Sequence, residues 1–386
     1  MKSNYNQLGQ YIEMVSRTNS DLKYGIEDVR GCSNTKQMMQ TRANLIGRTY
    51  EKFIVLRPQE FVFNRRTTRN GEKIGMAYNN TDREYIFTND YVAFRVKQEY
   101  LDKLLPDYLY MFFCRDEFDR YARYKSTGSA TEFFNWEDMC AVPFEIPPMD
   151  FQQLVVNAYK VLNERIETKQ KINDNLATQA LTLFSDFVSH LSKKLEQRKL
   201  GDVIASANTG GDAIQKVPIV DYDTGIKCAR VGDITNAREY ASWAFCNASK
   251  SVYDNYKLQA GDILVTRTAT LGITQYIAKD ISAVYNNGLI RLKVNDTNAL
   301  PLYIYWAMKT SDFLNYINQM NSATSVRPNM KIDYLLNYQL SIPSIEEQTQ
   351  FTNTVEPLMN AISLNNDEIL KLSEFQAIIL TTLSSR

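Results

Sequence analysis

Two stretches of the chain carry apolar side chains at alternating steps of four and three residues, the period of a helix that packs on another helix. The first covers residues 150–198 and the second covers the C-terminal tail. Neither helix can bury such a long stripe in a compact domain, and a globular segment lies between them, so we expect an antiparallel coiled coil. The predicted seam consists of Val155, Tyr159, Leu162, Ile166, Leu176, Leu183, Val355, Leu358, Ile362, Ile369, Leu372 and Ile379.

A few positions interrupt this apolar seam. Lys169, Asn173 and Asn365 fall on it, and polar residues there can fix the register of the pair at some cost in stability. Pro357 lies inside the second pattern, so the second helix either bends there or begins just before it. The helix pair is then either a hairpin with no further role or a spacer that separates two domains and offers its outer faces to partners.

The segments that precede the two helices repeat the same landmarks in the same order, roughly 190–200 residues apart. Each has a Leu-Gly turn before a short strand, a buried strand that ends in Arg, a polar loop after an aromatic-rich helix, and an apolar strand that ends in Pro. The matched segments are 8–12 and 200–204, 56–65 and 258–267, 128–131 and 321–324, and 142–147 and 339–343.

These patterns predict an α+β protein with two pseudo-repeated mixed α/β domains, separated by the two long helices. The expected division is 1–147 for the first domain, 148–198 for the central helix, 199–343 for the second domain and 344–386 for the C-terminal helix.

The composition limits the kinds of functional site that the chain can form. Lys and Arg number 44 and so do Asp and Glu, so no global field steers the protein toward an anionic partner. A single histidine, His190, and five scattered cysteines without a CxxC pair disfavour a catalytic triad, a metal cage and a disulfide framework. No glycine-rich cofactor turn or phosphate loop is present, so independent catalysis is not expected. The start has no signal-peptide core and no run is long enough for a membrane span, so we expect a cytoplasmic protein.

Nucleic acid would have to bind at local patches, and the densest basic run is Arg65–Lys73, at the exit of the first domain's buried strand. Cations and hydroxyls in loops contact phosphates, whereas Arg, Asn, Gln and Lys read base edges. Such a run is more often a solvated surface, but its recurrence at the equivalent place in the second domain favours function. The DNA-binding candidates are Arg65, Arg66, Thr68, Arg69, Lys73, Arg123, Lys125, Ser126, Arg267, Thr268, Thr270, Asn286, Asn287, Ser322, Thr324, Arg327 and Lys331.

Several motifs resemble those of the specificity (S) subunits of type I restriction-modification systems. They are Ala260–Arg267 with Gly272, the Ser322-Ala323-Thr324 loop, and Ile342-Pro343 followed by Glu346-Glu347-Gln348. In the first half, Pro147–Gln152 keeps the Pro and the Gln but differs at the acids, and Gln59-Glu60 stands where the second half has Gly-Asp.

The resemblance implies that each globular domain is a target recognition domain that reads one half of a bipartite site in double-stranded DNA. It also implies that the paired helices set the gap and dock two modification subunits, which carry the AdoMet chemistry, and that restriction subunits join through the complex. On this reading the chain is not an enzyme and binds no cofactor or metal itself. The alternatives are a helical-stalk adaptor whose domains bind protein, and a degenerate nuclease or methyltransferase that acts alone.

Overall fold

The computed structural model describes residues 6–41, 45, 47–67, 73–128, 132–191, 196–210, 218–322 and 329–383. The chain forms two compact units. Unit 1 contains residues 1–166 and 371–386, and unit 2 contains residues 167–370. Each long helix therefore contributes a segment to both units, and the four-part division expected from the sequence stays a prediction.

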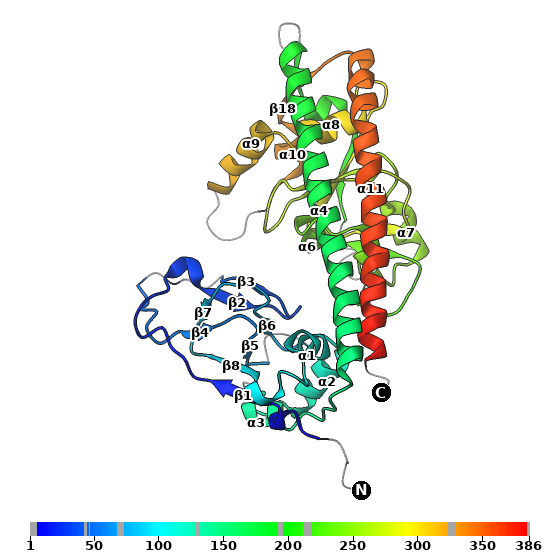
Figure 1. Cartoon of the computed structure of the whole chain (residues 1–386). Coiled ribbons are helices and arrows are strands. Elements are labelled where there is room, and N and C mark those ends of the chain that lie inside the picture. The colour runs from blue at the N-terminus through cyan, green and yellow to red at the C-terminus, as the bar shows by residue number, and fades with distance from the viewer. Residues whose placement is uncertain are drawn as a thin grey trace. The chain divides into compact units, whose positions relative to one another are not determined.

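Unit 1 is built on an antiparallel four-stranded sheet in the order β1-β8-β5-β6 (Figure 1). Two smaller ribbons, β2-β3 and β4-β7, extend it. Its elements are η1 (Leu8–Gln10), β1 (Ile12–Val15), η2 (Ile26–Asp28), β2 (Arg30–Cys32), β3 (Met38–Gln40), β4 (Ile54–Leu56), β5 (Phe61–Asn64), β6 (Met76–Tyr78), β7 (Tyr85–Phe87), β8 (Tyr91–Val96), η3 (Gln98–Tyr100), α1 (Pro106–Phe113), α2 (Asp116–Lys125) and α3 (Trp136–Cys140).

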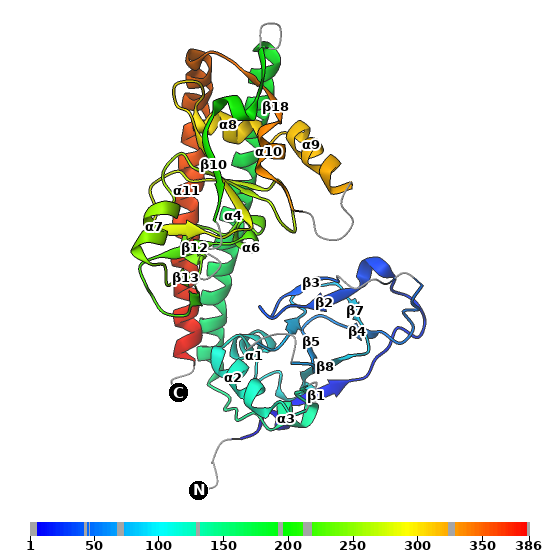
Figure 2. The same cartoon turned by 180° about the vertical axis from the view of Figure 1, so that it is seen from behind.

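Unit 2 is built on a sheet in the order β10-β17-β14-β15, also antiparallel. A second sheet, β11-β13-β12-β16, and the ribbon β18-β9 complete it (Figure 2). Its elements are β9 (Glu196–Lys199), η4 (Leu200–Val203), β10 (Ile204–Thr209), β11 (Ile219–Val220), β12 (Lys227–Ala229), α6 (Val231–Thr235), η5 (Tyr240–Ser242), β13 (Phe245–Cys246), α7 (Lys250–Tyr256), β14 (Ile263–Thr266), β15 (Thr274–Tyr276), β16 (Ala283–Tyr285), β17 (Leu289–Val294), α8 (Pro301–Ala307), α9 (Ser311–Ser322), α10 (Ile332–Leu336) and β18 (Gln339–Ile342).

The predicted internal repeat is confirmed by this topology. The four strands of the main sheet follow the same order in both units, and among the described residues three short α-helices follow the last of these strands in each before a long helix begins. Even the turn before β5 and β14 is the same: Gln59 and Gly261 both adopt positive φ (64° and 87°), and the next residue, Glu60 or Asp262, accepts a backbone N–H three residues back at 2.8 or 2.9 Å. The first half therefore keeps the turn although it lacks the Gly-Asp pair.

The two long helices are α4 (Met149–Leu191) and α11 (Ile345–Thr382). The helical pattern was expected to continue to residue 198, but α4 ends at Leu191 and Glu196–Lys199 form strand β9, which pairs with β18. Here the ladder of backbone hydrogen bonds with β18 overrides the helical periodicity. Helix α11 runs through Pro357, so the alternative of a helix that begins just before that residue is wrong.

Within each unit the segments of α4 and α11 pack antiparallel. In unit 2, Phe184 and Phe187 contact the ring of Phe351 with centroids 5.2 and 5.3 Å apart, and in unit 1, Gln376 donates to Asn163. The predicted seam residues are buried or half-buried, with one exception: Leu183 is 37% exposed and Phe184 is buried in its place. An α-helix drifts relative to a strict 3.5-residue repeat, so the buried stripe steps by four from Ala180 to Phe184 rather than by three.

Among the described residues, no helix is both long enough and apolar enough to cross a membrane.

Candidate nucleic-acid interface

The exit of β5 in unit 1 presents two exposed arginines, Arg65 and Arg66. Their backbone is held by the segment 132–134: the N–H of Phe134 donates to the carbonyl of Arg65 at 2.9 Å, and Arg66 forms an isolated bridge with Phe133. The Arg65 guanidinium makes no hydrogen bond or ion pair with any residue in the part of the chain that the structure describes. The Arg66 guanidinium lies 3.8 Å from the exposed carboxylate of Asp90.

The same segment 132–134 brings a second group of predicted residues to this place. Thr127 bridges to Phe133 on its other side, and the guanidinium of Arg123 lies 3.0 Å from the carboxylate of Glu132. We call Arg65, Arg66, Arg123 and Lys125 the unit 1 cationic edge. Exposed ion pairs of this kind contribute little to stability, so Arg66 and Arg123 can exchange a carboxylate for a phosphate at small cost.

The remaining predicted residues of unit 1 differ in position. Ser126 directly follows α2, and its hydroxyl donates to the carbonyl of Ala122 at 2.7 Å. Lys73 lies 3.4 Å from the exposed carboxylate of Asp116. Thr68 and Arg69 lie outside the described residues.

In unit 2 the arginine at the equivalent strand exit points back into its own loops. The carbonyl of Arg267 accepts from Met330 at 2.8 Å, which repeats the Arg65–Phe134 contact. However, the Arg267 Nε donates to the Met330 carbonyl at 3.1 Å, and its Nη1 reaches the carbonyl and the Oδ1 of Asn287 at 3.3 and 3.2 Å. Arg267 thus ties together the loops on either side of it, and its assignment as a DNA-binding residue stays a prediction.

The side chains of Asn286 and Asn287 also form hydrogen bonds within unit 2. The Oδ1 of Asn286 accepts from the N–H of Gly288 at 3.1 Å, and its own N–H donates to the carbonyl of Ala229 at 3.0 Å. A Cβ on Gly288 would come within 2.4 Å of Val231, so only glycine permits this approach. The loops after β12 and β16 and the exit of β14 therefore form one tightly packed group.

The other predicted residues of unit 2 lie around this group. Thr268 bridges to Asn329, and Thr270 is exposed on the loop after β14. Lys331 is exposed at the start of α10, and Ser322 is the last residue of α9. Thr324 and Arg327 lie outside the described residues.

Sequence reasoning missed two features of these edges. Tyr124 stands between Arg123 and Lys125 and is 82% exposed, a large aromatic side chain within the unit 1 cationic edge. In unit 2, Arg230 begins α6 with its Nε 3.2 Å from the buried carboxylate of Asp233. The signals were an aromatic residue between two cations, and a cation three residues before an acid.

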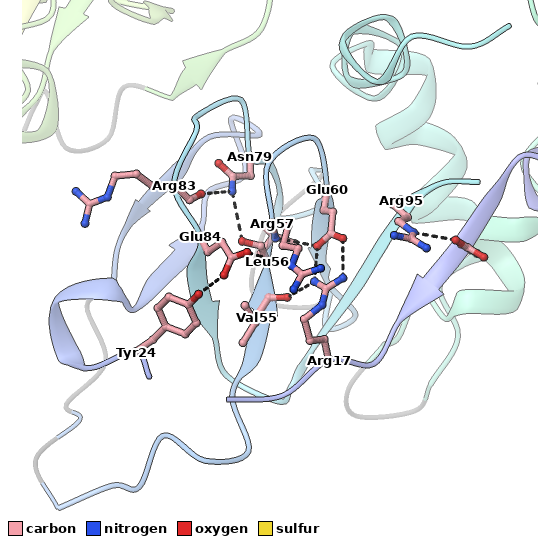
Figure 3. A network of polar contacts seen from close by, with 11 residues as sticks. Arg17, Tyr24, Val55, Leu56, Arg57, Glu60, Asn79, Arg83, Glu84 and Arg95 are labelled. Carbon is pink, nitrogen blue, oxygen red and sulfur yellow. Dashed lines mark hydrogen bonds and ion pairs between the residues drawn. The ribbon is translucent and has the colours of Figure 1, made fainter. Parts of the chain in front are cut away.

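A further cluster of cations lies at the other end of β5, where Glu60 precedes the strand (Figure 3). Glu60 is only 4% exposed and accepts two bonds from the Arg17 guanidinium, at 3.0 and 3.1 Å. Arg17 also donates to the carbonyl of Val55 in β4 at 3.1 Å, and Arg57 donates to Glu84 at 3.0 Å. Arg17 thus joins the main sheet to the β4-β7 ribbon, and Arg57 links the two strands of that ribbon, so we assign both arginines to the fold.

Residues 192–374 match the family model for the type I restriction modification DNA specificity domain. The type I restriction enzyme MjaIX specificity subunit of Methanocaldococcus jannaschii is 22% identical over 313 residues, which cover 73% of this chain and 69% of that protein. Residues 192–374 therefore carry a type I restriction modification DNA specificity domain.

The fold of the chain agrees with that assignment. The crystal structure of the type I restriction-modification system S subunit from M. genitalium matches it with a TM-score of 0.50 and 13% identity, covering 98% of this chain and 96% of the other. The resemblance drawn from the sequence motifs is therefore confirmed. The likeness in fold also includes the first half, which the family model does not cover.

Proposed function

We propose that this chain is a specificity subunit that reads a bipartite site in double-stranded DNA, one half with each unit, and carries out no catalysis itself. The observation that carries the proposal is the repeated strand exit. Arg65 and Arg267 occupy the same position after the same central strand, and each is held by the same backbone bond to the segment before the third short helix. Two copies of one scaffold with different side chains suit two different half-sites.

In unit 1, the cationic edge supplies the groups that phosphates and guanine edges accept from. Arginine makes bidentate contacts with a guanine edge, and each such pair contributes about 1–3 kcal/mol of discrimination. Phosphate contacts fix the position of a protein on the duplex without reading sequence. Because the chain carries no net charge, this local edge has to supply the attraction.

Among the described residues, unit 2 has fewer exposed cations at the equivalent edge. Its loops are packed against one another through Arg267 and Gly288, and Thr268, Thr270 and Lys331 surround them. A rigid loop holds a few polar groups at fixed positions, which favours recognition of base edges by shape and hydrogen bonds.

The helix pair is proposed to set the gap between the two half-sites and to dock two modification subunits. In unit 1, Leu154, Val161, Phe375 and Ile378 are all exposed. Each lies one position before a residue that faces the other helix, namely Val155, Leu162, Gln376 or Ile379, and in an antiparallel pair these positions flank the seam on the same side. The positions that follow the seam, such as Val156 and Leu380, pack on the core of unit 1 instead.

This face is proposed to receive the modification subunits, which would carry AdoMet, and restriction subunits would join through the assembled complex. In unit 2, Ile172 and Leu364 repeat the same relation to the seam and are also exposed. Apolar side chains exposed along one face of a helix pair are typical of an interaction surface.

The deciding experiment is to sequence methylated genomic DNA from cells that express the modification subunit with and without this chain. We expect methylation at a single motif with two specified parts and an unspecified gap, present only when the chain is expressed. Unchanged methylation would contradict the proposal. An adaptor that binds only protein would also show no retention of DNA by the purified complex at low salt.

A further inference from the structure

A chain of hydrogen bonds crosses the helix pair of unit 2 and ends on the globular part of that unit. It begins at Lys169 of α4, whose Nζ lies 2.7 Å from the carboxylate of Glu368 and donates to the Oδ1 of Asn365 at 2.9 Å. The Nδ2 of Asn365 donates to the Oδ1 of Asn173 at 2.8 Å. The chain thus passes from one helix to the other and back.

The remaining two bonds continue in the same direction. The Nδ2 of Asn173 donates to the Oδ1 of Asn366 at 2.7 Å, and the Nδ2 of Asn366 donates to the Oε1 of Glu239 at 2.6 Å. Every carboxamide accepts at its oxygen and donates from its nitrogen, with an ammonium at the start and a carboxylate at the end. Hydrogen bonds aligned in this way polarise and strengthen one another. We call Lys169, Asn365, Asn173, Asn366 and Glu239 the amide chain.

The carboxylate that ends the amide chain belongs to the segment that carries the unit 2 loops. The residue before Glu239 is Arg238, whose Nη1 lies 3.4 Å from Asp233, and Asp233 also holds Arg230 at 3.2 Å. Asp233 is 1% exposed in its side chain, so both arginines are anchored to a buried group. Arg230 leads into Val231, the residue against which the loop at Gly288 packs.

A polar layer in a helix pair also specifies register, because a slip of one helix leaves half-buried amides without partners. The layer here differs from the seam around Phe184, Phe351 and Val355, which is apolar and tolerates a shift more easily. The amide chain thus determines two positions at once: that of α4 along α11, and that of the Glu239 segment on the helices.

We propose that the amide chain is a positioning element for half-site spacing, with Glu239 and Asn366 as the residues that orient the unit 2 recognition loops on the helix pair. The proposal rests on the proposed function, since a gap has meaning only if two half-sites are read. Loss of the Asn366–Glu239 bond should leave each half-site readable and relax the gap between them.

The test uses the full chain in complex with its modification subunit, and a series of duplexes whose gap differs by one base pair from the native one. Hydrogen bonds to a charged group are among the stronger ones, so we expect Asn366→Ala and Glu239→Ala each to reduce the preference for the native gap by about five- to tenfold. The double variant should lose no more of the preference for the native gap than either single variant does. Glu239→Gln keeps the accepting oxygen and should retain most of the preference.

Asn360→Ala is the matched control, since this exposed asparagine lies on the same helix and forms no side-chain bond to any of the described residues. Glu239 is solvent-accessible, so its replacement leaves folding intact even if Asn366→Ala impairs it. An unchanged gap preference in folded Glu239→Ala would overturn the inference. Absence of any bipartite methylated motif in the wild type would instead contradict the proposed function.

Discussion

Gln152 and Gln348 close the same corner in the two halves of the molecule. Each is fully buried in the first turn of a long helix, and its Oε1 accepts the backbone N–H of the residue that precedes α1 or α8, Leu105 at 2.9 Å or Leu300 at 2.7 Å. Its Nε2 donates to the carbonyl of the proline that ends the preceding segment, at 2.8 or 2.9 Å. One carboxamide thus joins the helix, the domain and the connection between them.

This relationship predicts the cost of its removal. Gln348→Met leaves the Leu300 N–H and the Pro343 carbonyl buried without a partner, so we expect the free energy of unfolding to fall by about 2–4 kcal/mol. Gln350→Met, at an exposed position on the same helix, should change it by less than about 0.5 kcal/mol. Urea unfolding followed by circular dichroism measures both, and equal stability of the two variants would show that the corner contributes nothing.

The unit 1 cationic edge predicts a defect confined to one half-site. Replacing Arg65 and Arg66 of this edge, together with Arg69 of the same basic run in the sequence, with Ala should weaken DNA binding and relax sequence preference at the first half-site, while preference at the second is retained. Each phosphate contact that is lost should also reduce the slope of log affinity against log salt by about one. Arg83→Ala, at an exposed position elsewhere in unit 1, is the control. Unchanged affinity and methylation would show that the edge is ordinary surface.

Arg267 should behave differently from Arg65 because its guanidinium is used within unit 2. We expect Arg267→Ala to lower the free energy of unfolding by about 1–3 kcal/mol, since the Met330 carbonyl and Asn287 lose their donor. Arg267→Lys keeps the charge but cannot reach both acceptors, so recognition of the second half-site should remain impaired. Full recovery of second half-site recognition in Arg267→Lys would indicate that Arg267 contacts a phosphate instead.

The exposed apolar face of the helix pair predicts a loss of assembly without a loss of fold. Val161 and Ile378 are 61% and 57% exposed in unit 1. Changing both to Asp should abolish co-elution with the modification subunit while the thermal unfolding of the chain itself stays close to that of the wild type. Asn157→Asp introduces the same charge elsewhere on α4 and should not affect assembly. Normal complex formation by the double variant would place the docking surface elsewhere.

Lys309 predicts a pH dependence of stability. Its Nζ donates to the Thr274 carbonyl at 2.8 Å, and burial lowers its pKa from the ordinary 10.5 to about 8. Between these values the unfolded chain binds more protons than the folded one, so this residue makes stability rise with pH across that window, and below it the charged lysine costs free energy throughout.

Comparison with Lys309→Met isolates this effect from the titration of other groups. From about pH 7 to about pH 10, the wild type should gain roughly 1–3 kcal/mol relative to the variant. Urea unfolding midpoints across that range measure the difference. A difference that does not change with pH would show that Lys309 titrates normally.

Features that depend on interactions between residues close in sequence could be predicted, whereas those that depend on distant residues could not. The repeat, the two long helices and most of the seam follow from local periodicity, which reports the face that each residue presents. The prediction that Leu183 lies in the seam was wrong. Whether the buried stripe steps by three or by four residues at this point depends on how the helix drifts along its partner. The predicted end of the first long helix was wrong because strand β9 forms only by pairing with β18, which lies more than a hundred residues later in the chain.

The sequence by itself determined the architecture: a duplicated α+β module, each copy followed by a long amphipathic helix, and cations at the exits of the central strands. Only the tertiary structure decided what equivalent residues do, since Arg65 points outward and Arg267 binds its own loops. It alone also showed that Lys169, Asn173 and Asn365 join Asn366 and Glu239 in one directed chain. The physical reason is that periodicity reports which side chains are buried, whereas hydrogen-bond partners distant in sequence become neighbours only when the chain folds.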